Sequence, residues 1–177
     1  VYKRQIIDRL VDYSKSPDRA GSVIVGATCD TSGKFSYGGI LYGKGISYSM
    51  IGVDSPSVKC TTFNANCTLI PMEIMKRVKN VDSYYKHSMG DFDLGFRISR
   101  GGNDIYVMPE YVGMCNDNPI EGSWQDRSLG IVKRIKLKES FKGLPFKDWF
   151  HYLNRNFGFA TACVRSITPY IKILVGK

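Results

Sequence analysis

The sequence lacks the cysteine and histidine patterns of disulfide-bonded or zinc-binding domains. Its five cysteines are odd in number and scattered, with no CxxC pair and no histidine at a zinc-finger interval. Structural disulfides persist in oxidising compartments and are rare in the cytosol. We therefore expect free thiols, no structural metal and a reducing, cytoplasmic setting.

Long apolar runs are also missing. No stretch approaches the ~20 apolar residues that span a bilayer, and the first residues do not resemble a signal peptide. An initiator Met is absent, and residues 1–5 (VYKRQ) are typical of a translated sequencing adaptor. We expect residues 1–5 to be an artefact and the natural N-terminal part of the reading frame to lie outside this sequence.

Acidic residues are scarce towards the end of the chain. From Lys133 onward ten Lys or Arg stand against only Glu139 and Asp148, so this tail carries a net +8 of the total +9. Such a tail suits an anionic partner, either a phosphate-bearing surface or nucleic acid. Its interleaved aromatic residues also suit an anionic membrane interface. The alternative is that these aromatics pack back onto the preceding domain.

What is present predicts a mixed α/β domain followed by helices. We expect an amphipathic helix over residues 6–13, a strand over residues 22–27 that is buried on both faces, and a helix from Pro71 to about Val78. A hairpin is predicted where the turn at residues 30–33 leads into residues 35–37, and the glycines between Gly33 and Gly52 predict a region rich in loops, with weak strand signals.

Residues 90–100 carry a strong helix signature. Acidic residues open the segment, basic residues end it, and Gly101 and Gly102 follow. Two short strands, 104–108 and 111–113, are expected around Pro109, and the chain beyond Trp124 is predicted to be helical and basic. We therefore expect one domain over residues 6–132 and a basic aromatic helical tail over residues 133–177.

The segment Gly90–Arg97 (GDFDLGFR) resembles the acidic motif of family 2 glycosyltransferases. The similarity extends, in the order of that family, through Phe63–Pro71, Ile105–Gly113, Gly122–Asp126 and Lys142–Pro145. The resemblance is to the C-terminal half of these enzymes, and to those of the rhamnosyltransferase type that build bacterial surface polysaccharide. It implies a partial GT-A (nucleotide-diphospho-sugar transferase) fold that transfers sugar with inversion.

The resemblance assigns the catalytic base to Asp91, and a supporting or sugar-contacting role to Asp93 and Gly90. An inverting transfer needs a base to take the acceptor hydroxyl proton, and a carboxylate in a first helical turn is favoured in its ionised form by the macrodipole. The alternative is that both acids only cap the helix, with Asp93 paired to Arg97.

Three further residues are candidates for sugar binding. Asn64 and Asn66 match positions that line the sugar pocket of similar enzymes, and their amides can both donate and accept hydrogen bonds. Trp124 could stack on a sugar ring. The alternatives are turn residues for the two Asn and a core position for Trp124. Arg134 is expected on a solvated face, and His87 and His151 are expected to be structural because neither has a convincing partner in the sequence.

The resemblance also implies a nucleotide-sugar donor, a saccharide or lipid-linked saccharide acceptor, and a divalent metal (Mn²⁺ or Mg²⁺). Asp91-Phe92-Asp93 satisfies a bare Asp-x-Asp pattern, but the metal motif of the family normally ends a strand in the preceding half, so the ligands are expected mostly outside this chain. Met114-Cys115 stands where many members have a metal-binding His.

Two other functions stay open at this point. A basic nucleic-acid-binding domain would fit the calculated pI of about 9.3, although the sequence has no nucleic-acid motif and its charge is confined to one end, so no nucleic-acid partner is expected. A non-catalytic relative that retains the fold is the second. We further expect these 177 residues alone to lack transferase activity, and removal of the preceding half to expose one face of the strand at 22–27.

Overall fold

The computed structural model describes residues 4–176, which form two compact units. Unit 1 comprises residues 4–81 and Leu94–Asp117, and unit 2 comprises Asp82–Asp93 and residues 118–176. The predicted boundary between residues 132 and 133 falls inside unit 2. Residues 1–3 of the expected adaptor lie outside the described residues, whereas Arg4 and Gln5 begin the first helix.

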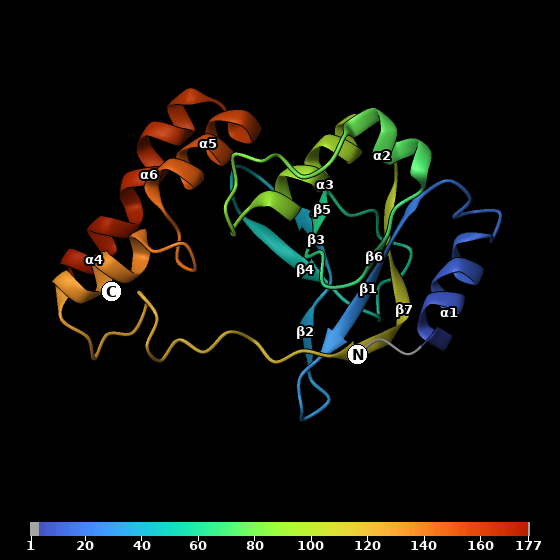
Figure 1. Ribbon diagram of the computed structural model, residues 1–177, viewed down its shortest axis with the longest axis horizontal. Coiled ribbons are helices and arrows are strands. Elements are labelled where there is room, and N and C mark those ends of the chain that lie inside the picture. Colours follow the sequence, from blue (N-terminus) through green and yellow to red (C-terminus); the bar gives the residue numbers. More distant parts are fainter. Residues whose placement is uncertain (1–3, 177) are drawn as a thin grey trace. The chain divides into compact units, whose positions relative to one another are not determined.

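Unit 1 is built on a mixed sheet whose central strand is β1 (Val23–Cys29). β1 pairs in parallel with β7 (Ile105–Met114) and antiparallel with β2 (Phe35–Tyr37) and β6 (Thr68–Leu69). Figure 1 shows β1 and β7 side by side. The expected buried strand and the hairpin that follows it are confirmed, and the unit is of the mixed α/β class.

A smaller antiparallel sheet lies within the glycine-rich region. Its strand order is β4 (Tyr48–Ile51), β3 (Gly39–Tyr42), β5 (Thr62–Phe63). The loop-rich region expected at residues 33–52 therefore also holds β3 and β4, where the sequence carries only weak strand signals. Glycine is required at position 39 of β3, because an ideal Cβ there would lie 2.3 Å from the Sγ of Cys60.

Helices cover both faces of the β1–β7 pair. α1 (Arg4–Ser14) packs on one face, and α2 (Met72–Val78) and α3 (Gly90–Arg100) lie on the other (Figure 1). All three helices were predicted and are confirmed. The α1 face holds Leu10, Ile24, Tyr106, Met108 and Val112. The opposite face holds Val23, Val25, Ala27, Cys60, Phe63, Ile74, Leu94, Ile98, Ile105 and Val107.

This arrangement buries both faces of β1 within the chain itself. Val23, Ile24, Val25 and Ala27 are all fully buried. We expected one face of this strand to be exposed without a preceding half of the protein. That expectation is wrong, because α1 packs on this face.

β7 is one strand with a bulge rather than two strands. Val25 of β1 pairs with Val107, but Ala27 pairs with Tyr111, so the pairing skips over Pro109. Proline has no N–H to donate and is tolerated at bulges. The pairing resumes beyond the bulge, which corrects the prediction of separate segments 104–108 and 111–113.

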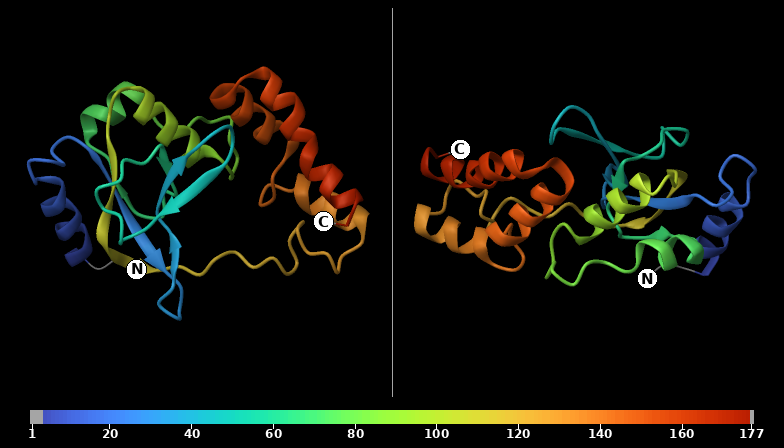
Figure 2. Two further views of the ribbon diagram at one scale, coloured as in Figure 1. Left: turned by 180° about the vertical axis from the view of Figure 1, so that it is seen from behind. Right: turned by 90° about the horizontal axis from the view of Figure 1, so that it is seen from above.

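Unit 2 is helical beyond Trp124, as predicted. It contains α4 (Ile131–Glu139), α5 (Phe146–Phe157) and α6 (Phe159–Leu174). Figure 2 shows α5 and α6 as consecutive helices joined by a tight turn, where Gly158 adopts a φ of 88°. Over residues 4–176, none of the helices has the length and apolar character required to traverse a bilayer.

Candidate functional site

The motif helix α3 opens on a strained residue. Met89, which directly precedes it, has a φ of 67°, a left-handed conformation that costs non-glycine residues of order 1–3 kcal/mol. Its carbonyl nevertheless accepts the Asp93 backbone N–H at 2.9 Å, so the first turn is closed. Such strain persists only where the surroundings impose it.

The two carboxylates of the motif occupy different environments. Asp93 is fully buried and accepts a hydrogen bond from Asn156 Nδ2 at 3.1 Å, with Arg155 Nε 3.5 Å from the same oxygen. Asp91 is half-buried in the first turn, and the N–H of Phe92 donates to its Oδ1 at 2.9 Å. Asp93 is thus tied to α5, whereas Asp91 sits at the helix N-terminus with partial access to solvent.

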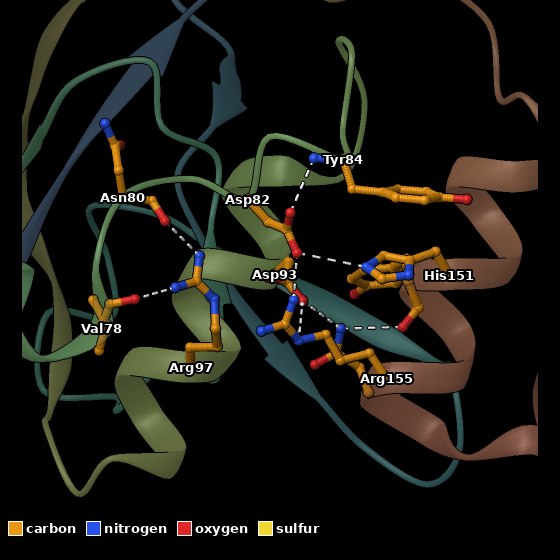
Figure 3. Close-up of polar contacts among 10 residues, drawn as sticks. Val78, Asn80, Asp82, Tyr84, Asp93, Arg97, His151 and Arg155 are labelled. Atoms are coloured by element: carbon orange, nitrogen blue, oxygen red, sulfur yellow. Dashed lines mark hydrogen bonds and ion pairs between the residues drawn. The ribbon is translucent and has the colours of Figure 1, made fainter.

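A second acid, Asp82, anchors α5 from the segment before α3. Figure 3 shows Asp82 close to His151 and Arg155, which lie one turn apart on α5. Arg155 Nη1 is 2.6 Å from Asp82 Oδ2, and His151 Nε2 is 3.6 Å from it. The Tyr84 backbone N–H, followed by Arg155, holds the pKa of the Asp82 carboxyl below its usual range.

Two tyrosines complete this cluster. The Tyr84 ring stacks on His151 with centroids 4.0 Å apart. Tyr85 is buried, and within residues 4–176 its hydroxyl has no hydrogen-bond partner. Burial, and then the nearby Asp93 charge, raises the pKa of Tyr85, so this phenol stays protonated at neutral pH.

Asp82→Asn should reveal the Asp82 contribution through its pH dependence. Folding lowers the pKa of Asp82, so the unfolded chain binds more protons in acid than the folded chain does. The contribution of Asp82 to stability is therefore complete above the unfolded pKa of about 4, and it is lost as the pH falls through the pKa of the folded state. We expect the variant to be about 1–2 kcal/mol less stable at pH 7. Urea unfolding from pH 7 to 2 should show this gap narrowing.

Asp12→Asn is the matched control, because Asp12 pairs with Lys15 on an exposed surface and its loss should change stability by less than about 0.5 kcal/mol. A gap for Asp82→Asn that stays constant with pH would mean that the carboxylate charge plays no part.

A cavity of about 500 Å³ lies in unit 2 beside the segment that leads into α3. Its polar lining includes His87, Asn118, Glu121 and Gln125, and Trp124 is its aromatic wall. Sugar sites combine an aromatic face with amides and carboxylates that exchange hydrogen bonds with hydroxyls.

Trp124 is held in this cavity by a buried arginine. Arg134 Nε donates to the Trp124 carbonyl at 2.9 Å, and Arg134 is only 2% exposed. The expectation of a solvated Arg134 is therefore wrong. Ser88 Oγ donates to the Gly143 carbonyl on the cavity wall at 2.9 Å, so the residues immediately before α3 are bound to this wall.

The predicted site residues fall into two groups. Gly90, Asp91, Asp93 and Trp124 belong to unit 2, and Gly90 is the buried first residue of α3. Asn64 and Asn66 belong to unit 1, at the turn between β5 and β6, where the Asn64 N–H donates to the Gly38 carbonyl at 3.0 Å. The structure therefore describes the acids and Trp124 in one body and the two asparagines in another.

Sequence reasoning missed the α5 side of the site. His151 is not without a partner, since it contacts Asp82 and Tyr84. Arg155 and Asn156 were not singled out at all. The available signal was the i,i+4 spacing of His151 and Arg155, which places both on one helix face.

The residues present do not form a metal site at Asp91-Phe92-Asp93. Side chains two apart on a helix do not face each other, and Asp93 is engaged with α5. Among residues 4–176, no cluster of three His, Cys, Asp or Glu is arranged to hold an ion.

Searches of family models, curated proteins and solved structures found no match to this chain.

Proposed function

We propose that this chain supplies the base and the acceptor side of an inverting, GT-A-type glycosyl transfer, with Asp91 as the base. The observation that carries this proposal is the division between the two motif acids. Asp93 is buried and bonded to α5, which suits a positioning role, and Asp91 is half-buried at a helix N-terminus, which suits an ionised acceptor of protons.

The reaction needs one proton transfer from the acceptor. Asp91 takes the hydroxyl proton while the acceptor oxygen bonds to the anomeric carbon, and the bond from that carbon to the diphosphate breaks. The nucleoside diphosphate leaves from the opposite face, so configuration inverts. The cavity walled by Trp124 would hold the acceptor saccharide. We also propose that the product is a polysaccharide.

The donor nucleotide and its Mn²⁺ or Mg²⁺ would be held mostly by residues outside this chain. We therefore expect calorimetric titration of the 177-residue chain with nucleotide sugars and Mn²⁺ to show no micromolar binding, and a product assay to show no turnover. A protein that carries this chain together with a nucleotide-binding half should transfer sugar with inversion, read from the product's anomeric NMR couplings.

Two results would contradict the proposal. Micromolar donor binding with turnover by the chain alone would mean that the nucleotide site has been misplaced and that Asp91-Phe92-Asp93 must be reconsidered. A product with retained configuration would exclude a single displacement assisted by Asp91.

A further inference from the structure

Two helices of unit 2, α4 and α6, expose apolar side chains to water, and α4 also buries two of its charged residues. α4 buries Arg134 and Lys138 and exposes Ile131 and Val132. α6 buries Ala162, Ser166, Pro169 and Ile173, and it also exposes large apolar side chains on another face. A helix on a water-exposed surface normally turns its apolar face inward.

Five exposed apolar residues of α6 form one continuous stripe, which does not include the exposed Phe159 at its start. Ala160, Val164, Ile167, Ile171 and Leu174 follow a four-three-four-three spacing, which keeps them on one helix face. The last four are between 51% and 66% exposed. We call these five residues the α6 stripe. Scattered apolar residues on a surface need no explanation, but a stripe of this length along one helix does.

The buried charges show that this orientation is part of the fold. Lys138 is fully buried, where its Nζ donates to Glu139 at 2.6 Å and to the Leu144 carbonyl at 2.8 Å and lies 4.0 Å from the centre of the Tyr170 ring. Tyr170 in turn donates to Glu139 at 2.5 Å. α4 therefore uses its polar side to pack on α6, beside which it lies (Figure 2), and turns Ile131 and Val132 outward.

The charges around the stripe select its partner. α6 contains no acidic residue, and Arg165 and Lys172 are exposed beside the stripe. At the start of α4 a shallow depression of about 510 Å³ is lined by Ile131 and Val132 together with Lys133 and Lys136. The two acids of residues 131–176 are occupied or buried, since Glu139 bonds Lys138 and Asp148 is 7% exposed. The accessible charge of these helices is therefore positive.

We propose that the α6 stripe and the start of α4 dock this chain on an anionic phospholipid surface. Apolar side chains enter the boundary between headgroups and acyl chains, and the flanking lysines and arginines meet the lipid phosphates. A second copy of the chain would bring the same positive charges against this surface, which disfavours self-association. The inference does not depend on the proposed transferase activity.

Vesicle co-sedimentation of the 177-residue chain tests this surface. We expect binding to vesicles that contain phosphatidylglycerol and not to vesicles of pure phosphatidylcholine. Binding should weaken as the salt concentration rises from about 50 to about 500 mM, because salt screens the attraction between the cationic side chains and the lipid phosphates. The double variant Lys133→Gln/Lys136→Gln should bind about 25-fold more weakly, from about fivefold for each cation. Ile167→Gln/Ile171→Gln should lower binding by at least tenfold, on the order expected for losing two buried apolar side chains.

The control is Met72→Gln, which changes an equally exposed apolar side chain on α2 in unit 1 and should bind as the parent does. Circular dichroism would show that each variant keeps its helices. Equal binding of the parent and the α6 double variant would overturn the proposal. A stable dimer in analytical ultracentrifugation that is lost in the same double variant would also overturn it, because the stripe would then bind a second copy.

Discussion

In a protein that carries this chain together with a nucleotide-binding half, the proposed function predicts that Asp91→Asn slows sugar transfer by about 10²–10⁴-fold, the usual contribution of a general base. Asn has nearly the same shape and keeps an oxygen that can accept the Phe92 N–H, so the start of α3 should be preserved. Donor affinity should be unchanged. The measurement is kcat with saturating donor and acceptor, together with urea unfolding of the variant.

Asp93→Asn is the matched comparison for Asp91→Asn. This substitution removes the charge of a buried carboxylate that Asn156 and Arg155 contact, so it should lower the free energy of unfolding by about 1–3 kcal/mol. The two variants therefore separate a chemical role from a structural one. If Asp91→Asn keeps more than about a tenth of the parent rate, the base lies elsewhere.

Gly95→Ala should destabilise unit 1 by about 2–3 kcal/mol, although Ala is ordinarily the better helix former by about 1 kcal/mol. An ideal Cβ at Gly95 would lie 2.1 Å from the Oγ1 of Thr62 and 2.7 Å from its Cα. Thr62 is a fully buried residue of β5, so its backbone cannot retreat without disturbing the smaller sheet. Thermal and urea unfolding would measure the loss.

Gly130→Ala provides the control for the Gly95 substitution. Gly130 is the N-cap of α4, with a φ of −63° and no atom within 4 Å of an added Cβ, so Ala should cost there only the weaker cap, less than about 1 kcal/mol. Parent-like stability of Gly95→Ala would show that α3 and β5 are not packed as closely as described.

Local signals explain which parts of the fold could be predicted. α3 was predictable because acids, bases and terminal glycines mark its ends within eleven residues. β1 was predictable from its apolar, β-branched composition. By contrast, β3 and β4 contain or adjoin glycines, and their strand character depends on pairing with each other and with β5. Such pairing leaves no local periodicity to detect.

The candidate site was predictable at the start of α3 and at Trp124, but not on its α5 side. Asp91 and Asp93 stand in a recognisable motif, but nothing in that motif distinguishes the buried acid from the half-buried one. That distinction comes from Asn156, 63 residues further along the chain. The buried state of Arg134 was equally hidden, because its partner is the backbone carbonyl of Trp124 and not a side chain of opposite charge.

The parallel pairing of β1 with β7 also has a consequence for how the chain folds. Val23 pairs with Ile105, so the central contact of unit 1 joins segments separated by most of that unit and by the inserted residues Asp82–Asp93. Closing so long a loop lowers the conformational entropy of the chain before the stabilising contacts form. Domains with many non-local contacts therefore fold slowly. The β1–β2 hairpin and the helices α1 and α2 can form earlier from neighbouring residues. During synthesis, one edge of β1 therefore stays unpaired until residues 105–114 have emerged, and an unpaired strand edge of this kind favours aggregation.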